Sequence, residues 1–376
     1  MLITIRALVA ARVRIPMRRP VATVSGMWLD HESWVIRVHR DDGRTGLGEA
    51  VVEPSAGEVA DTILTSLIRE TVERVSESGL PSMTELELHG APGRALNAAI
   101  ESALLDLERA PTTDVLPDGA GVGVNATLPS LGTAAAAEAA RQSVESGFET
   151  LKLTAGAERE TEVLVERLRA IRAAIGPDVR LRLDVNGAWD LSTAEDRLSA
   201  ISRFDIEFVG QPLPAHDVDG LAELRRRVRV PIAADEAASS VGAARTLLAA
   251  DAVDVLVLRP ARVGGSAAVT EIAERAAEHG IPVVISTLFE TGIGLAAGLA
   301  MAADLPAVDG ESFATPPDHG LATAGLLDHD LLAEGLLVAR GRMHVPGRPG
   351  SGGLGIVLDD RALERYVVER VGSSQA

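Results

Sequence analysis

The chain has 376 residues, of which 46% are hydrophobic, 24% charged and 2% aromatic. This length exceeds that of a usual single domain, and the composition is that of a globular protein with a large aliphatic core. The formal net charge of −18 argues against a nucleic-acid partner, because such a partner requires a basic surface. The absence of cysteine excludes disulfides, thiolate catalysis and cysteine-ligated metals.

No segment approaches the ~18 uninterrupted apolar residues of a membrane-spanning helix. The first residues, Met1-Leu-Ile-Thr-Ile-Arg6, lack the long apolar core of a signal peptide and are typical of a strand. These features predict a soluble cytoplasmic protein that binds neither a membrane nor nucleic acid.

Residues 1–54 alternate apolar and polar side chains, as in Trp34-Val-Ile-Arg-Val38, and Asp41-Asp-Gly43 is a hairpin turn signal. They predict a three-stranded antiparallel sheet. Residues 57–75 and 94–109 instead space their apolar residues as a helix does. The stretch 111–119 contains two prolines and a glycine, so we expect it to end the second helix and to serve as a linker. We therefore predict a separate α+β domain over residues 1–115.

Beyond this linker, short apolar runs alternate with amphipathic helical stretches such as 160–175 and 266–278. The runs end near Asn125, Leu153, Leu183, Val209, Ala234, Leu258 and Ile285. Such alternation is typical of βα units and a parallel sheet. With an eighth strand expected around residues 306–310, it predicts an α/β fold, a (β/α)8 TIM-like barrel, over residues 120–325. We expect residues 326–376 to pack back on the N-terminal domain.

Active sites of such barrels lie at the carboxyl ends of the strands. Asp184 and Asp235 each follow an apolar run, and each is followed by a second polar residue, Asn186 or Glu236. Carboxylates that converge from separate strands are ligands for hard cations such as Mg²⁺. The alternative is that each aspartate is a helix N-cap or a loop hydrogen-bond acceptor.

At this point the chain resembles the enolase superfamily, in its muconate-lactonizing and o-succinylbenzoate-synthase-like subgroup. The resemblance covers nearly the whole length, and it implies that residues 1–115 are the family's capping domain. It rests on these motifs in order: Gly46-Leu-Gly-Glu-Ala50, Asn97-Ala-Ala-Ile-Glu-Ser-Ala-Leu-Leu-Asp106, Val124-Asn-Ala-Thr127, Arg262-Val-Gly-Gly265, Ser286-Thr-Leu-Phe-Glu290 and Pro349-Gly-Ser-Gly-Gly-Leu-Gly355.

The resemblance implies abstraction of a proton alpha to a carboxylate. In that family, Mg²⁺ on three carboxylates stabilises the enediolate, and two lysines on opposite faces act as acid and base. Asp184 and Asp235 match the first and third metal ligands. Gly210 stands where the middle ligand, a glutamate, is expected. We therefore expect metal binding at Asp184 and Asp235 to be weakened or absent.

The expected lysines are also incomplete. Lys152 matches the first lysine of a Lys-x-Lys pair, but Thr154 stands at the second, and Arg259 replaces the opposing lysine. Threonine has no useful basicity, and a guanidinium stays protonated, so Arg259 suits a carboxylate clamp better than a base. Lys152, Arg259 and Thr154 remain the candidate catalytic positions, and the usual two-lysine mechanism is not expected.

Two further positions are candidate substrate-binding residues. Arg19 lies in the segment that resembles the family's capping loop, and Glu290 follows an apolar run at the expected barrel mouth. Glu290 has an alternative role as a helix cap. The histidines show no metal-ligand spacing, and His216 is an acid or base candidate or a solvated loop residue.

Two hypotheses follow. The first is an isomerase or lyase (cycloisomerase, dehydratase or epimerase type) on a small carboxylate substrate, without the two-lysine pair. The second is a non-catalytic barrel that binds a small ligand or a partner protein, motivated by the replacements at Thr154, Gly210 and Arg259. The family analogy also implies a homo-oligomer.

Overall fold

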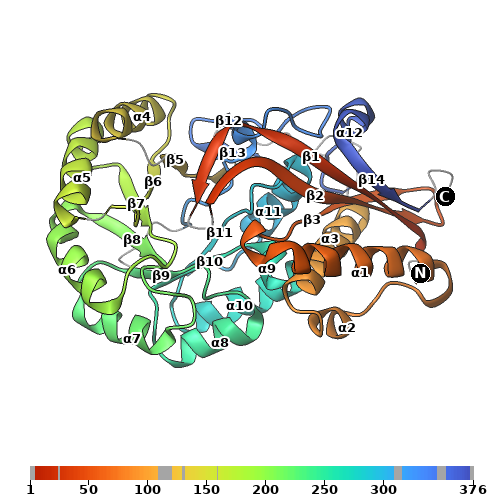
Figure 1. Cartoon of the computed structure of the whole chain (residues 1–376), viewed down its shortest axis with the longest axis horizontal. Helices are drawn as coiled ribbons and strands as arrows, with labels where there is room; N and C mark the ends of the chain where they lie inside the picture. The colour runs from red at the N-terminus through yellow and green to blue at the C-terminus, as the bar shows by residue number, and fades with distance from the viewer. Residues whose placement is uncertain are drawn as a thin grey trace.

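A computed structural model describes residues 5–23, 26–108, 121–128, 132–158, 160–308, 316–344 and 353–372. Figure 1 shows two units side by side: an antiparallel sheet with its helices, and a curled parallel sheet whose outer face is covered by helices. The predicted linker, residues 111–119, lies outside the described residues.

The antiparallel sheet has the strand order β14-β1-β2-β3. Its strands are β1 (Ile5–Thr23), β2 (Gly26–Arg40), β3 (Thr45–Ala50) and β14 (Val367–Val371). The first three were predicted. The fourth comes from the far end of the chain, because Ala10 and Ala11 of β1 pair with Val371 and Arg370.

Three helices follow this sheet in the chain: α1 (Gly57–Ser78), α2 (Met83–Glu87) and α3 (Ala91–Glu108). The first and third agree with the helices predicted at residues 57–75 and 94–109. A core that includes Trp34, Leu64 and Leu96 joins the sheet to α1 and α3. The short α2 was not predicted; a capping box between Ser82 and Glu85 begins it.

The parallel sheet contains seven strands in the order β11-β10-β9-β8-β7-β6-β5. They are β5 (Ala126–Leu128), β6 (Thr150–Thr154), β7 (Arg180–Asp184), β8 (Ile206–Gly210), β9 (Ile232–Ala234), β10 (Val255–Leu258) and β11 (Val283–Ile285). Six of them belong to predicted apolar runs, and β5 begins directly after Asn125, where the first run was predicted to end. The predicted parallel sheet and its alternation with helices are confirmed.

Six helices form an arc around the outside of the sheet (Figure 1): α4 (Thr133–Glu145), α5 (Thr161–Ile175), α6 (Leu191–Ile201), α7 (Val218–Arg227), α8 (Val241–Ala249) and α10 (Ser266–Glu278). The short α9 (Pro260–Val263) precedes α10, and α11 (Gly292–Ala303) follows β11. In α5 the buried residues Leu164, Leu168, Ile171 and Ile175 share one face. That face packs against sheet residues such as Leu181 and Leu183 in one core, which leaves the alternate residues of β7 to face the barrel interior.

The barrel closes at His319 and Gly320, not at residues 306–310 as predicted. Parallel bridges join Gly320 to Ser286 after β11 and His319 to Val124 before β5. Of the predicted eighth strand, residues 306–308 form no strand, and residues 309–310 lie outside the described part of the chain. The bridging residues are polar or glycine, so no apolar run marked them.

The C-terminal region contributes β12 (Val338–Ala339), β13 (Arg342–Met343) and α12 (Asp360–Tyr366). The strands β12 and β13 form a small sheet with β4 (Val122–Gly123). Single 3₁₀ turns occur at Pro54–Ala56, Ser202–Phe204 and Ala324–Leu326. The division into segments 1–115, 120–325 and 326–376 stays a prediction.

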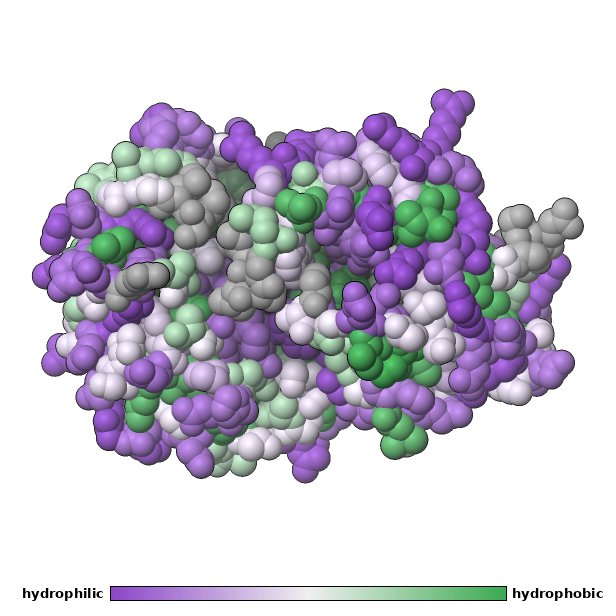
Figure 2. Space-filling model, in the orientation of Figure 1, coloured by the Kyte–Doolittle hydropathy of each residue, from purple (hydrophilic) through white to green (hydrophobic). Residues whose placement is uncertain are grey.

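Hydrophilic residues cover most of the face in Figure 2, and hydrophobic residues occur there in separate small groups. This surface agrees with the net charge of −18. Among the described residues, no helix combines the length and apolarity needed to cross a bilayer.

Candidate active site

The strand-end residues singled out in the sequence lie in register. Thr154 pairs with Asp184, and Asp184 pairs with Gly210, across β6, β7 and β8. Parallel strands present their carboxyl ends at one edge, so these positions lie at the same level of the barrel. Lys152 lies two residues deeper and pairs with Arg182.

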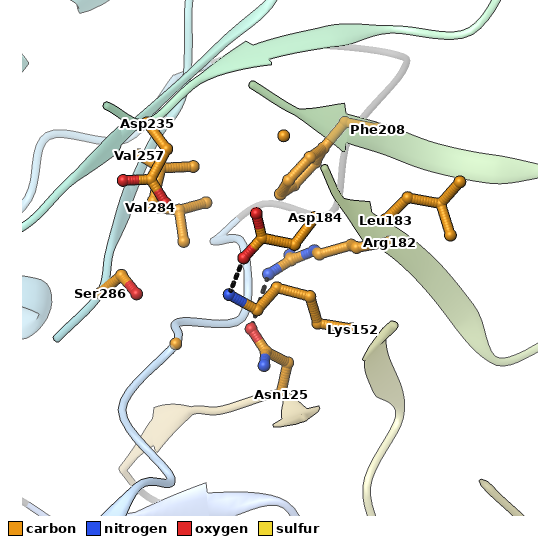
Figure 3. A pocket seen from close by; sticks show the side chains of 12 residues that line it. Asn125, Lys152, Arg182, Leu183, Asp184, Phe208, Asp235, Val257, Val284 and Ser286 are labelled. Atoms are coloured by element: carbon orange, nitrogen blue, oxygen red, sulfur yellow. Dashed lines mark hydrogen bonds and ion pairs between the residues drawn. The ribbon is translucent and has the colours of Figure 1, made fainter. Parts of the chain in front are cut away.

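A cavity of about 20 Å³ lies among these strands, and its lining includes Lys152, Asp184, Gly210 and Asp235 (Figure 3). One water needs roughly 10–15 Å³ of such space. The structure therefore brings three predicted site residues, Lys152, Asp184 and Asp235, to one small cavity.

The first carboxylate of the cavity, Asp184, is paired with Lys152. The Lys152 Nζ donates to Asp184 Oδ2 at 2.7 Å, as the dashed line in Figure 3 marks. The other oxygen, Oδ1, accepts from Asn186 Nδ2 at 2.7 Å. Asn186 adopts a left-handed backbone, with φ of 51°, a conformation that asparagine tolerates better than most residues. Both oxygens of Asp184 are thus engaged.

The second carboxylate, Asp235, is held by two arginines. Its Oδ2 accepts from Arg259 Nη2 and its Oδ1 accepts from Arg262 Nη1, each at 2.6 Å. Glu53 forms a further ion pair with Arg262, and lies 3.5 Å from Arg259 Nη1. Burial alone would raise the pKa of Asp235, but the charges of Arg259 and Arg262 hold it below its ordinary range.

Arg259 is therefore committed to carboxylates of the chain itself. It is nearly buried, at 9% exposure, and it is not among the residues that line the cavity. Burial lowers the pKa of its guanidinium, but the charges of Asp235 and then Glu236 outweigh this and raise the pKa. The carboxylate that Arg259 clamps in the structure is Asp235.

Glu236 follows Asp235 and lies 3.7 Å from Arg259 Nη2 and 3.4 Å from Asn186 Nδ2. Burial, and then the charge of Asp235, raise the pKa of Glu236 from its ordinary value of 4.5 to about 7. The side-chain oxygen of Gln211 fixes this turn, because it accepts from the backbone N–H groups of Asp235 and Ala237.

Gly210 leaves room beside these acids. A Cβ atom at this position would meet nothing closer than the carbonyl oxygen of Leu183 at 3.4 Å, which is an ordinary contact. Within the described part of the chain, no group of three or more histidine, cysteine, aspartate or glutamate side chains is placed to hold a metal ion.

The two predicted substrate-binding residues lie apart from the cavity lining. Arg19 is exposed on β1. Glu290 is buried, and burial together with the charge of Glu49 raises its pKa from 4.5 to about 7. Thr291, next in the chain, caps α11 and donates its own backbone N–H to Glu49. The roles predicted for Arg19, Glu290 and Thr154 stay predictions.

Sequence reasoning missed Arg262 and Glu53, which complete the ion-pair network, and Asn125, Arg182 and Ser286, which line the cavity. Arg182 and Ser286 carried a usable signal, because each is a polar residue in or directly after an apolar run. Glu53 carried none, since it pairs with Arg262 across 209 residues of sequence.

These features define a capped (β/α)-barrel with a polar cavity at the carboxyl ends of its strands. The family model described as "Enolase C-terminal domain-like" matches residues 135–362. An N-succinylamino acid racemase from Amycolatopsis sp. is 30% identical over 358 residues, which cover 91% of this chain and 92% of that protein. The chain belongs to this enolase family, as its motifs predicted.

Two more comparisons agree. An o-succinylbenzoate synthase from Thermobifida fusca is 42% identical over 237 residues, covering 63% of this chain and 68% of that protein. A dipeptide epimerase from Cytophaga hutchinsonii, solved with Mg and the dipeptide D-Ala-L-Val, has a TM-score of 0.80 at 21% identity and covers 99% of both chains. The predicted barrel class is confirmed, and the relatives support the predicted class of activity, an isomerase or lyase on small carboxylates.

Proposed function

We propose that this chain is an isomerase or lyase that moves a proton next to a carboxylate group of a small substrate, with Lys152 as the proton-transfer residue. The observation that carries the proposal is the position of Lys152 in the cavity, where Asp184 fixes its Nζ at 2.7 Å. A fixed amine is poised to exchange a proton with a bound substrate.

The proposed step is an enolisation. The α C–H bond breaks, its electron pair passes into the adjoining carboxylate, and the proton goes to the Nζ of Lys152, which has first released its ammonium proton to solvent. An isomerase adds a proton from solvent to the opposite face of the same carbon while Lys152 gives its proton to solvent, and a lyase expels a leaving group from the neighbouring carbon. The ammonium formed on Lys152 then faces the charge that develops on the carboxylate, which stabilises it electrostatically. Arg259 and Arg262 act as positioning residues, because they form ion pairs with Asp235 and do not line the cavity.

The proposed mechanism does not use the family's three-carboxylate magnesium centre, because the donor set does not fit the ion. Mg²⁺ favours free carboxylate oxygens in octahedral geometry. Here Asp184 is bonded to Lys152 and Asn186, Asp235 is bonded to two arginines, and position 210 supplies no oxygen ligand. Weakened or absent metal binding is thus part of the proposal.

The test is exchange of the α-proton for deuterium, followed by NMR with N-succinylamino acids and dipeptides, the compounds named for the relatives. We expect exchange with at least one compound, retained in excess chelator and lost in Lys152→Met. The matched control is Lys152→Arg, which keeps the charge beside Asp184 but stays protonated; it should also lose exchange while keeping the fold. Exchange that survives Lys152→Met, or that requires added Mg²⁺, would refute the proposed mechanism.

The second candidate is a non-catalytic barrel that binds a small ligand or a partner protein. It is favoured by one observation: both acids of the cavity are already neutralised by cationic side chains. A ligand that shifts the unfolding temperature but shows no deuterium exchange in the unmodified protein would support it over the enzyme. Assembly into a homo-oligomer also stays a proposal.

A further inference from the structure

Residues 49–53, at the end of β3 and just beyond it, contact the barrel, and we call them the docking strap. Figure 1 shows β3 beside α11, where the two units meet. Three alternate side chains of the strap, those of Glu49, Val51 and Glu53, contact the barrel, as side chains on one face of a strand can do. Val51 lies in a buried cluster with two apolar residues of the barrel, and Glu53 forms its ion pair with Arg262. The strap thus joins the N-terminal sheet to the barrel through one apolar contact and two carboxylates.

The first of these carboxylates, Glu49, lies at the N-terminus of α11. Its Oε2 accepts from the backbone N–H groups of Thr291 at 3.0 Å and Gly294 at 3.1 Å, which a helix itself leaves without acceptors. Its Oε1 lies 3.1 Å from the Nε2 of His31 in β2. Burial alone would raise the pKa of Glu49, but His31 and the hydroxyl of Thr291 hold it below its ordinary range. Glu49 is therefore an ionised anchor between the two units.

A second acid, Glu290, contacts the same helical turn. A Cβ atom at Gly294 would lie 2.6 Å from the Cβ of Glu290 and 3.2 Å from the Oε2 of Glu49, so both side chains pack against this glycine. Glu290 is 5% exposed. Burial, and then the charge of Glu49, raise the pKa of Glu290 to about 7. The proton on Glu290 thus depends on the presence of the strap.

The other charged groups around this turn come from two further elements. His31 belongs to β2, and Asp330 belongs to the C-terminal segment, where it accepts from the backbone N–H of Gly292 at 2.7 Å. Burial, and more weakly the charge of Glu49, raise the pKa of Asp330. Of these groups only His31 can carry a positive charge, and it already contacts Glu49. Ionisation of Glu290 therefore places two carboxylates of the same charge at one helical turn.

We propose that the docking strap is a pH-dependent latch between the N-terminal sheet and the barrel. It holds α11 while Glu290 is protonated, and it separates from α11 when Glu290 ionises, because separation removes Glu49 and admits water to Glu290. Separation also moves Glu53 away from Arg262. The latch thus connects the acids at α11 to the ion pairs around Asp235.

The direction and the size of the effect follow from proton linkage. The pKa of Glu290 is about 7 beside the docked strap, and its ordinary value in water is 4.5. The docked form therefore binds the proton more tightly, and its advantage is complete below pH 4.5 and is lost as the pH rises to about 7. From these two values, the ratio of separated to docked protein should rise about fortyfold between pH 5 and pH 7.

Hydrogen exchange resolved to single amides measures this ratio, because the N–H groups of Thr291 and Gly294 lose their acceptor when the strap separates. After correction for the intrinsic pH dependence of exchange, we expect both amides to exchange about fortyfold faster at pH 7 than at pH 5. Leu183, which is buried in the middle of β7, reports global unfolding. It should exchange at least about tenfold more slowly than either amide at both pH values.

Three variants separate the latch from a general loss of stability. Glu290→Gln keeps the shape of the side chain but cannot ionise, so exchange of both amides should differ by less than about threefold between the two pH values. Glu53→Gln weakens the far end of the strap, so exchange should be about fivefold faster at both pH values, with the same ratio. The control Glu101→Gln removes another carboxylate between the two units, which accepts from the N-terminus of α10 at 2.8 and 2.9 Å. It should leave both amides unchanged.

The latch would be overturned by exchange at Thr291 and Gly294 as slow as at Leu183, or by a ratio below about fivefold in the unmodified protein. An undiminished ratio in Glu290→Gln, unchanged rates in Glu53→Gln or a changed ratio in Glu101→Gln would have the same consequence. Thermal unfolding checks that each variant folds, and the two comparisons in the unmodified protein decide if Glu290→Gln does not. The measurement uses no substrate, so its result is independent of the deuterium-exchange test of the proposed enzyme.

Discussion

The ion pairs around Asp235 give the most direct test of the site's electrostatics. We predict that Asp235→Asn destabilises the fold more than an ordinary loss of a salt bridge. Asp235 is 3% exposed and accepts from Arg259 and Arg262 at 2.6 Å each. An asparagine of the same shape can accept only one of these bonds, and its amide would face the other guanidinium.

The magnitude follows from the burial of the partners. Removing one member of a buried pair typically costs ~3–5 kcal/mol, because an uncompensated charge is left behind. Here Glu53 and Glu236 remain close to Arg259, at 3.5 and 3.7 Å, so part of the compensation is kept. We therefore expect a loss of about 3 kcal/mol in the free energy of unfolding.

Urea unfolding followed by circular dichroism measures this loss, with Asp254→Asn as the matched control. Asp254 accepts from Arg225 Nε at 2.7 Å, but its side chain is 24% exposed, so its loss should be about 1 kcal/mol. Adding Arg259→Met to Asp235→Asn should recover part of the stability, because it removes the unpaired guanidinium. Equal losses for the two aspartates, or strictly additive losses for the pair, would refute the reasoning.

Two further predictions concern Glu290 and position 210. Glu290 has a pKa of about 7 instead of 4.5, because of burial and the charge of Glu49; the folded state thus binds the extra proton, and about 3 kcal/mol of stability is lost as the pH rises from ~4.5 to ~7. Glu290→Gln should remove this loss in urea unfolding at several pH values, and parallel profiles for the two proteins would contradict it. Gly210→Glu should fold, since its Cβ is 3.4 Å from Leu183 O, and added Mg²⁺ should raise its unfolding temperature but not that of the unmodified protein. The same response in both proteins would show that a carboxylate at position 210 does not affect Mg²⁺ binding.

The periodicity of the sequence was sufficient for most of the barrel. In β7, leucines at 181 and 183 alternate with polar residues. This alternation predicts which face of the strand is buried against helices. The closure at His319 and Gly320 has no such pattern, because two single bridges between neighbouring strands replace a run of apolar residues. Local sequence therefore predicts that the barrel closes, but not where.

The same distinction between local sequence and long-range packing applies to the site. Asp184 and Asp235 were found because a polar residue at the end of a buried strand is informative by position alone, whereas Lys152 was found by its match to the family's lysine pair. The commitment of Arg259 to Asp235 could not be read there, because it depends on Glu53 and Arg262 arriving from distant parts of the chain. The sequence thus identified the residues of the site. The ion pair that each residue forms depends on the packing of distant segments.

The replacements at positions 210 and 259 form one electrostatic unit. With glycine at 210 the cluster lacks one negative charge, and with arginine at 259 it carries a positive charge that no ordinary pH removes. Three cationic side chains, Lys152, Arg259 and Arg262, then face the carboxyl groups of Asp184, Asp235, Glu53 and Glu236. Because the pKa of Glu236 is raised to about 7, this last group titrates near neutral pH and brings the cluster close to zero charge when protonated. A balanced cluster has little to gain from a divalent cation, so restoring a glutamate at 210 without also replacing Arg259 should create a weaker metal site than the two changes together.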